Sequence, residues 1–338
     1  MKKALFIILT AALFSSCTEE KSSLPETNPL SEQLKKTPLF NILKTKDWQL
    51  NDSLHSRAIY VKNEHEIFVG SYAGRLLKIT SDGHNLTQSY FSTPSNLEDI
   101  RGIIYFDGAL ISINSGTNSY IFKNQEGFND HKLVYSKENQ FINGILKWKD
   151  KMIVFGDPDK SSKLVVLTSE NGRKWKKIDG PQTLPNEAGF SASNTAMCLR
   201  PEGKVWIGTG GDSIARVHYS SDYGANWSTY NTPLVSDESS GIFSIHFYDD
   251  LNGVAVGGSW LSPDSTKNIS AVTRDGGKTW NTTNGLRGYR SCVSSNGKIT
   301  IACGRNGADY SLDKGKTWNP LFDEAFYTVV VKDGYAWF

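Results

Sequence analysis

The chain has 338 residues, with 37 Lys and Arg against 35 Asp and Glu and a formal net charge of +2. A charge this close to balance argues against electrostatic capture of nucleic acid and against a polybasic membrane patch. The length fits one large all-β domain or two ordinary domains.

The N-terminus resembles a bacterial lipoprotein signal. Lys2 and Lys3 precede an apolar run from Ala4 to Phe14, and Cys17 follows two serines. The run is too short for a membrane-spanning helix. We therefore interpret residues 1–17 as a signal peptide with Cys17 as the lipidated residue. A plain secretory signal is the alternative, since Phe14 departs from the usual leucine.

Residues 18–40 are rich in Pro, Ser, Glu and Lys, a composition typical of a flexible tether. We expect this tether to join the lipid anchor to a folded domain, residues 41–338. The sequence thus predicts a secreted protein that is lipid-anchored to the outer membrane. The acidic start of the tether resembles a surface-export signal, and both the periplasmic face and the cell surface stay open.

From residue 57 onward, apolar side chains recur with period two, which predicts β-strands. The first strands of successive units are expected at residues 57–61, 101–106, 143–148, 192–199, 242–247 and 290–294. Second strands are expected at residues 66–71, 204–209, 253–258 and 298–304. The mature chain contains no convincing amphipathic helix.

A repeat of the form Ser/Thr-x-Asp-x-Gly-x-Thr-Trp, the Asp-box or BNR repeat, organises these strands. Four copies align without gaps at residues 168–175, 220–227, 273–280 and 311–318, and two degenerate copies precede them. They recur roughly every 40 to 50 residues, the scale of a four-stranded propeller blade. Asp and Ser/Thr stabilise such a turn, glycine supplies a positive φ, and tryptophan wedges between blades. Structural roles are therefore expected for Asp222, Trp227, Asp275, Trp280, Asp313 and Trp318.

The spacing predicts an all-β fold, a seven-bladed β-propeller, with six blades as the alternative. Six units span residues 57–322, and a further strand is expected at residues 325–331. Residues 41–50 would complete its blade from the N-terminal side and so remove exposed strand edges. Whether the C-terminus is truncated stays open.

The repeats, together with residues 187–193, 208–211, 239–244 and 288–291, resemble bacterial relatives of the photosystem II assembly factor Ycf48/HCF136. The resemblance covers nearly all of the mature chain. It implies a seven-bladed propeller with a binding role, since well-studied members act as assembly chaperones. Nothing in the sequence suggests photosynthesis, so only the fold and a binding role carry over. Some relatives carry the label oxidoreductase, for which the residues give no reason.

The sequence gives no support for a cofactor or a metal. Residues 208–213 lack the last glycine of a dinucleotide-binding fingerprint and no helix follows them. The six histidines are scattered without ligand spacing. Cys292 and Cys303 flank a hairpin turn, which leaves both a disulfide and two free buried thiols open.

Arginines stand at the starts of three first strands, where a propeller's central opening usually binds ligands. Arg57, Arg101 and Arg290 are expected to converge on one anionic group, since guanidinium pairs bidentately with carboxylates. The alternative is a structural role, in which each arginine forms an ion pair with a carboxylate and links neighbouring blades. The remaining expected rim residues are Glu98, Asp99, Glu187, Tyr289 and Asp157.

We therefore expect a non-enzymatic binding or assembly propeller, a monomer that recognises a protein or peptide partner through this rim. The alternative is a glycan-active or glycan-binding, sialidase-like propeller, which would need two carboxyl groups at catalytic separation beside the arginines. A loop tryptophan, Trp260, is a second candidate contact, with packing against a neighbouring loop as its alternative.

Overall fold

A computed structural model describes residues 55–82, 86–91, 99–125, 131–332 and 334–338, and the backbone alone of residues 5–10 and 44–49 and of Leu86. The predictions for Cys17, the tether and Glu98 lie outside these residues.

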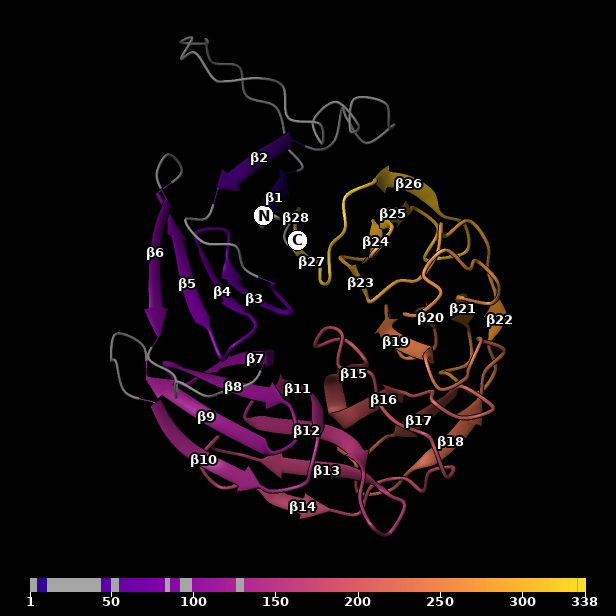
Figure 1. The fold of residues 1–338 in the computed structure, drawn as a ribbon, viewed down its shortest axis with the longest axis horizontal. Helices are drawn as coiled ribbons and strands as arrows, with labels where there is room; N and C mark the ends of the chain where they lie inside the picture. The colour runs from indigo at the N-terminus through magenta and orange to yellow at the C-terminus, as the bar shows by residue number, and fades with distance from the viewer. Residues whose placement is uncertain are drawn as a thin grey trace.

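Six antiparallel sheets, each of four consecutive strands, stand around a common centre (Figure 1). The first three are β3 (Ala58–Asn63), β4 (Glu66–Gly70), β5 (Leu76–Ser81) and β6 (Leu86–Phe91); β7 (Asp99–Phe106), β8 (Ala109–Ser115), β9 (Ser119–Gln125) and β10 (His131–Lys137); and β11 (Ile142–Trp148), β12 (Lys151–Pro158), β13 (Leu164–Ser169) and β14 (Lys176–Ile178).

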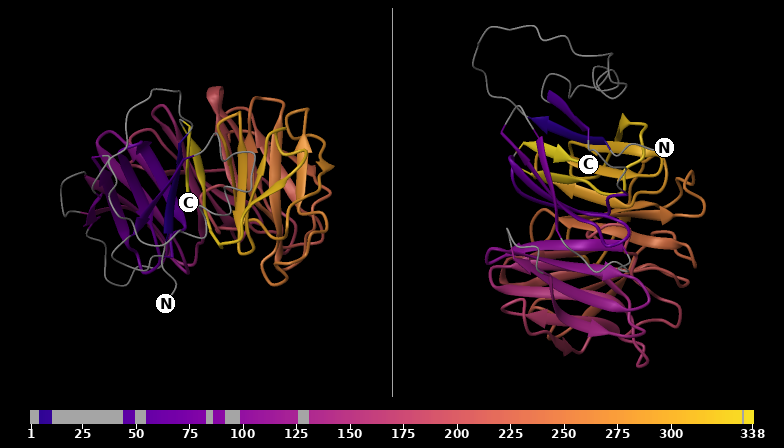
Figure 2. Two further views of the ribbon diagram at one scale, coloured as in Figure 1. Left: turned by 90° about the horizontal axis from the view of Figure 1, so that it is seen from above. Right: turned by 60° about the vertical axis from the view of Figure 1, so that its left-hand side comes forward.

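The next three sheets follow in the same order around the ring. They are β15 (Met197–Arg200), β16 (Lys204–Gly208), β17 (Arg216–Ser220) and β18 (Ser228–Asn231); β19 (Ser240–Phe247), β20 (Gly253–Ser259), β21 (Ser270–Thr273) and β22 (Asn281–Thr282); and β23 (Cys292–Ser295), β24 (Thr300–Gly304), β25 (Gly307–Ser311) and β26 (Asn319–Phe322). The first strand of each sheet lies nearest the centre, and Figure 2 shows the sheets side by side in a disc. The predicted β-propeller is confirmed.

The ring is closed by a sheet of mixed origin. Its order is β2 (Lys44–Gln49), β1 (Leu5–Thr10), β28 (Tyr335–Trp337) and β27 (Val330–Lys332). The count of seven blades is therefore corrected to six complete blades, because this last sheet is not one repeat of consecutive strands. The expected C-terminal strand begins later than predicted, at Val330.

The hydrophobic core lies between neighbouring sheets. Most clusters combine the facing sides of two neighbouring sheets, as where Ile111 of β8 packs with Ile145 and Val154 of the next blade. At the closure, Trp337 packs in the cluster of Ile59 and Leu77, and the adjacent Phe338 packs in the cluster of Phe322. Successive residues of a strand face opposite sides, so these two aromatic residues join the first and sixth blades.

A β-bulge lies near the N-terminal end of several first strands. The pairing skips Arg101 in β7, Asn143 in β11 and Phe243 in β19. In the first blade the amide of Arg57 donates to Gly70 O at 3.0 Å, although Gly70 pairs with Ala58. The sixth blade repeats this pattern, with Ser291 N donating to Cys303 O at 2.8 Å. A bulge changes the direction of the extra side chain, so it determines which side chain points toward the central opening.

Candidate functional site

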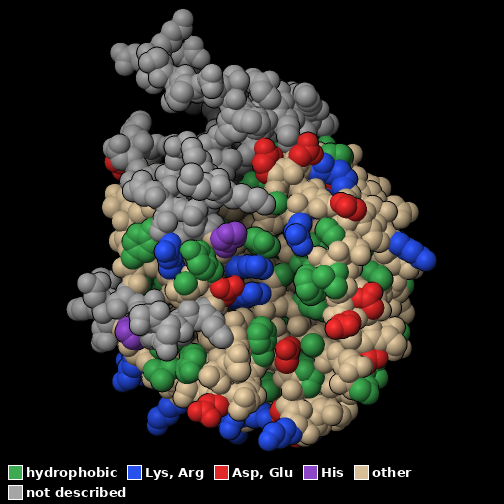
Figure 3. Space-filling model, viewed as in Figure 1, with side chains coloured by type: hydrophobic (Ala, Val, Ile, Leu, Met, Phe, Trp, Pro, Cys, Tyr) green, Lys and Arg blue, Asp and Glu red, His purple; other side chains and the backbone are tan. Residues whose placement is uncertain are grey.

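Two of the three predicted arginines occupy this bulged position in neighbouring blades. Arg57 lies directly before β3, and Arg101 is the extra residue of β7. The two guanidinium groups are close enough for the positive charge of Arg101 to act on Arg57. Figure 3 shows basic, acidic and hydrophobic side chains gathered near the middle of one face. We call Arg57 and Arg101 the rim pair.

Arg57 is held by a ring rather than by a carboxylate. Its guanidinium carbon lies 3.9 Å from the centre of the Tyr327 ring, a cation–π contact. Its Nε atom is buried and has no hydrogen-bond partner among the described residues. Burial, together with the charge of Arg101, lowers the pKa of Arg57. These two effects disfavour the cationic form, and an anion bound nearby would offset both.

Arg101 is fixed in place by two segments. Its Nη2 donates to Asp99 Oδ2 at 2.9 Å, and its Nη1 donates to Ser191 O at 2.8 Å and to Ser191 Oγ at 3.2 Å. Its Nε is also buried without a partner among the residues that the structure describes. The prediction placed Asp99 beside the arginines, and it lies there. The rim pair thus carries two positive charges and is bonded to one carboxylate.

An aromatic wall of Phe190, Phe243 and Tyr289 lies beside the rim pair. The rings of Phe190 and Phe243 stack with centres 4.1 Å apart, and Tyr289 meets Phe243 edge-on at 4.7 Å. Tyr289 is 3% exposed and burial raises the pKa of its phenol, an effect that the charge of Arg57 opposes. Tyr289 was among the expected rim residues, whereas the two phenylalanines and Tyr327 were not.

Arg290 does not reach the opening, and the expected convergence of three arginines is corrected to two. Its side chain is fully buried, and its Nε donates to Asp309 Oδ2 at 2.9 Å with a second, shorter bond from Nη2. The reason is register: Ser291, one residue later, holds the bulged position that Arg57 and Arg101 hold in their blades. A shift by one residue turns a strand's side chain to the opposite face.

Glu187 bonds to Arg216 and His218 and not to the rim pair, which corrects its expected place beside those arginines. Its fully buried carboxylate accepts bonds from Thr209 Oγ1 at 2.5 Å and from Arg216, and lies 2.9 Å from His218 Nε2. Burial alone would raise the pKa of Glu187. The hydrogen bonds from His218, Arg216 and Thr209 outweigh burial and lower the pKa to about 2.

Asp157 is bonded to its own blade and to the following loop. Its Oδ1 accepts from Asn143 Nδ2 at 2.7 Å and from Gly189 N at 3.0 Å. Asn143 is the bulged residue of its blade, equivalent to Arg101, so Asp157 lies one strand behind that position. Burial raises the pKa of Asp157 to about 6, against the lowering effect of these two bonds.

The repeated turns lie at the other end of the blades. Asp275 Oδ1 accepts from the amides of Lys278 and Thr279, and the amide of the adjacent Gly276 donates to Leu251 O in the hairpin that joins β19 and β20. Asp222 and Asp313 make equivalent bonds in their own turns. Trp280 and Trp318 are buried in cores between blades, and Trp227 is partly buried. Since first strands begin at the rim and end at these hairpins, the turns lie on the opposite face.

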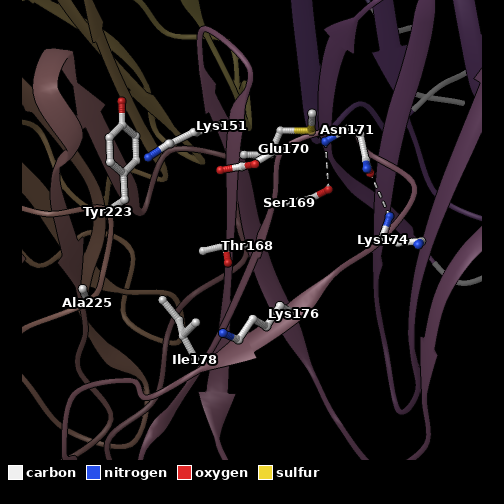
Figure 4. Close-up of a pocket in the computed structure, with 11 residues that line it drawn as sticks. Lys151, Thr168, Ser169, Glu170, Asn171, Lys174, Lys176, Ile178, Tyr223 and Ala225 are labelled. Carbon is white, nitrogen blue, oxygen red and sulfur yellow. Dashed lines mark hydrogen bonds between the residues drawn. The ribbon is translucent and has the colours of Figure 1, made fainter.

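A hollow of about 430 Å³ lies among these turns, between the third and fourth blades (Figure 4). Lys151, Lys174 and Lys176 line it with Glu170, and the Lys151 ammonium lies 4.7 Å from the centre of the Tyr223 ring.

A second hollow of about 480 Å³ lies between the fifth and sixth blades. There Lys314 lies 5.5 Å from the ring of Tyr248. The recurrence at the same place in two interfaces identifies both hollows as products of blade packing.

The two cysteines that flank a hairpin are direct cross-strand partners. Cys292 pairs with Cys303, and both are fully buried free thiols. This favours the alternative of free thiols over a disulfide. Within the described ranges no group of three or more His, Cys, Asp or Glu side chains is placed to hold a metal ion. No helix in that same part of the chain is long and apolar enough to cross a membrane.

Comparison with known proteins identifies the fold. No protein-family model matches the chain, and no curated protein matches it. The WD40 β-propeller domain of Doa1 is similar with a TM-score of 0.60 and 10% identity, over 85% of this chain and 93% of that one. YCF48 bound to a D1 peptide matches with a TM-score of 0.56 and 10% identity, over 86% and 93%. The WD40 repeats of RRP9 match with a TM-score of 0.58 and 12% identity, over 84% and 86%. At these identities the likeness shows the fold alone: the chain is a β-propeller like those of WD40 proteins and YCF48.

Proposed function

We propose that this chain is a binding propeller whose rim pair, Arg57 and Arg101, recognises an acidic group of a protein partner. The observation that carries the proposal is that two partly exposed guanidinium groups lie close together and, among the described residues, only the carboxylate of Asp99 is bonded to them. Both Nε atoms are buried and so beyond the direct reach of a ligand. A carboxylate bound at the exposed part of the pair would offset the repulsion between the two positive charges.

The balance of charge around the rim pair supports an anionic ligand. Two guanidinium groups lie close together, and among the described residues the carboxylate beside them is that of Asp99, which accepts a hydrogen bond from Arg101 and acts on Arg57 through its charge. Tyr327 covers the face of the Arg57 guanidinium, so a planar, bidentate acceptor would approach from the edge. Carboxylates of Asp, Glu or a chain terminus have that shape.

A protein or peptide is the partner class that fits best. Of the aromatic wall, Phe190 is partly exposed beside the rim pair and offers the kind of apolar contact that concentrates binding energy in protein interfaces, while Phe243 and Tyr289 are buried behind it. A similar propeller, YCF48, has been solved with a D1 peptide bound. We also propose that the repeated turns are Asp boxes and that the chain is a bacterial relative of Ycf48/HCF136, on the motifs of the sequence.

We further propose that lipid on Cys17 anchors the protein at the outer membrane, after a cleavage that removes residues 1–16 and with them β1 of the closing sheet. The support is the signal at residues 1–17 and the tether-like composition of residues 18–40. Metabolic labelling with an alkyne fatty acid tests this: wild type should be labelled and Cys17→Ala should not. Equal labelling of both proteins would refute the anchor.

The glycan-active alternative gains no support from the site. Glycoside hydrolysis needs two carboxyl groups flanking one bond. Glu187 is enclosed in its own network with Arg216 and His218, and Asp99 is bonded to Arg101. These placements give the two carboxylates separate structural tasks.

The test is affinity capture from detergent-solubilised membranes, with the wild-type protein and an Arg57→Gln/Arg101→Gln variant as baits. The matched control is Arg274→Gln, which removes an exposed arginine from the repeated turn on the opposite face. Far-ultraviolet circular dichroism and thermal unfolding establish that each bait is folded.

We expect one protein to co-purify with wild type and with Arg274→Gln, and to be lost from the double variant. The proposal would be refuted if all three baits recovered the same proteins in equal amount, or if wild type recovered none. A sialoside screen would then test the glycan alternative.

A further inference from the structure

The loop after β20 presents two large apolar side chains to solvent. Trp260 is 45% exposed and Leu261 is 64% exposed. Both residues follow directly on a strand whose own seven residues are all buried. Exposed aromatic residues of this size are enriched in protein interfaces and depleted elsewhere on surfaces.

The backbone of this loop is fixed at several points. Trp260 N donates to Ser239 O at 3.2 Å, and Trp260 O accepts from Arg305 Nη1 at 3.1 Å. Three residues on, Pro263 O accepts from Asn306 Nδ2 at 3.0 Å. The two side chains are therefore displayed by an anchored backbone, so a partner would lose little binding energy to ordering the loop.

The loop adjoins the proposed site through Tyr289. Tyr289 N donates to Pro263 O at 2.8 Å, and the Tyr289 ring belongs to the aromatic wall. The residue before it, Gly288, has φ +138°, and a Cβ there would lie 2.2 Å from Pro263 O, so only glycine permits this approach. The charges of Arg57 and Arg305 both act on the Tyr289 phenol, so the ring lies near the rim pair and near the arginine that bonds to Trp260 O.

We propose that Trp260 and Leu261 form an apolar anchor for the partner whose acidic group binds the rim pair. The partner segment is then an extended peptide that carries a carboxylate and, a short distance along the chain, a large apolar side chain. This inference rests on the proposed function, because it takes Arg57 and Arg101 as the site of the carboxylate.

The experiment uses a displayed library of random 12-residue peptides as the probe. It is selected in parallel on wild type, on Trp260→Ser/Leu261→Ser and on Arg57→Gln/Arg101→Gln. The matched control is Leu312→Ser, which removes a 58% exposed leucine from a repeated turn on the opposite face. Affinities for the synthetic consensus peptide are then measured by fluorescence anisotropy.

Wild type and Leu312→Ser should enrich peptides that combine Asp or Glu with a large apolar residue at a preferred spacing. Trp260→Ser/Leu261→Ser should keep the acidic preference, lose the apolar one, and bind the consensus peptide at least tenfold more weakly. Changing the apolar residue of the peptide to Ser should weaken wild type to the same degree and leave that variant unaffected.

Two results overturn the inference in different ways. If wild type selects acidic peptides with no apolar preference, or the loop variant binds them as tightly, the anchor fails while the proposed function stands. If selection yields no acidic preference, no enrichment, or a preference that survives in the arginine variant, the proposed function fails and the anchor with it.

Discussion

Replacing Arg290 by methionine tests whether this arginine is a structural residue rather than a ligand contact. Methionine fills a similar volume but donates no hydrogen bond. The change removes the bonds to Asp309 and the bond from Nη1 to Tyr289 O at 2.9 Å. The Asp309 carboxylate is fully buried and would keep one guanidinium partner, Arg287, whose Nε donates to Oδ1 at 2.7 Å.

The structure sets the expected size of this effect. Removing one partner of a buried ion pair costs about 3–5 kcal/mol, because the remaining charge stays buried without compensation. Since Arg287 still neutralises part of the Asp309 charge, we expect the lower end, about 3 kcal/mol. For a domain of this size that lowers the melting temperature by roughly 6 °C.

Urea and thermal unfolding of Arg290→Met, Asp309→Asn and the double variant provide the assay. The double variant should be destabilised by clearly less than the sum of the single variants, with a coupling energy of at least about 1 kcal/mol. Arg274→Met, on an exposed turn, should change stability by less than about 0.5 kcal/mol. A single variant as stable as wild type, or strictly additive effects, would refute the buried pair as a stabilising element. The folded Arg290→Met protein should retain the partner that Arg57→Gln/Arg101→Gln loses.

Three further changes have defined outcomes. Burial raises the pKa of Asp157 to about 6, so the folded state favours its protonated form. The free energy of unfolding should therefore fall as the pH rises from about 4 to about 6. Asp157→Asn should flatten that fall in urea titrations, and an unchanged slope would contradict the assignment. The pKa of Glu187 is lowered to about 2, so its stabilisation is complete above about pH 4.5 and is lost toward pH 2. Glu187→Gln should therefore cost about 2–3 kcal/mol at pH 7 and much less at pH 3; a cost independent of pH would count against the carboxylate network. Gly277→Ala should cost more than Gly297→Ala, because both have positive φ but only the first would press a Cβ to 3.2 Å from Trp206. Equal melting temperatures for these two variants would show that crowding contributes nothing.

Much of the fold could be predicted from the sequence because its signals are local and repeated. Strand periodicity placed β3, β16 and β20 within a residue or two of their observed bounds. The ring closure was predicted only in part. Residues 41–50 and the C-terminal strand were expected in one blade, and β2 and β27 do belong to one sheet, but the insertion of β1 was not expected. The closing sheet places β1 between β2 and β28, which no periodicity indicates.

The site was predicted only in part, because its geometry depends on register. Arg57 and Arg101 were identified correctly as neighbours, whereas Arg290 looked equivalent to them in a count from the strand start. A signal was available: a small residue and then a β-branched one follow Arg57 and Arg101 as Ala58-Ile59 and Gly102-Ile103. The same pattern, here Cys292-Val293, follows Ser291 and not Arg290. Tyr327 carried no such signal, since its contact with Arg57 joins residues from opposite ends of the chain.

The lysine–tyrosine contacts beside the two hollows of the turn face bear on how freely blades could be exchanged. In one interface the lysine comes from a hairpin and the tyrosine from a repeated turn, as Lys151 and Tyr223; in the other the roles are reversed, as Tyr248 and Lys314. A column-by-column alignment of the repeats would record two unrelated substitutions where the packing has kept one contact. Grafting the third blade's hairpin into the fifth position would set Lys151 against Lys314, and the reciprocal graft would set two tyrosines together. The blades are thus alike in architecture but not interchangeable, and part of the information that fixes their order around the ring lies in which side of each junction carries the charge.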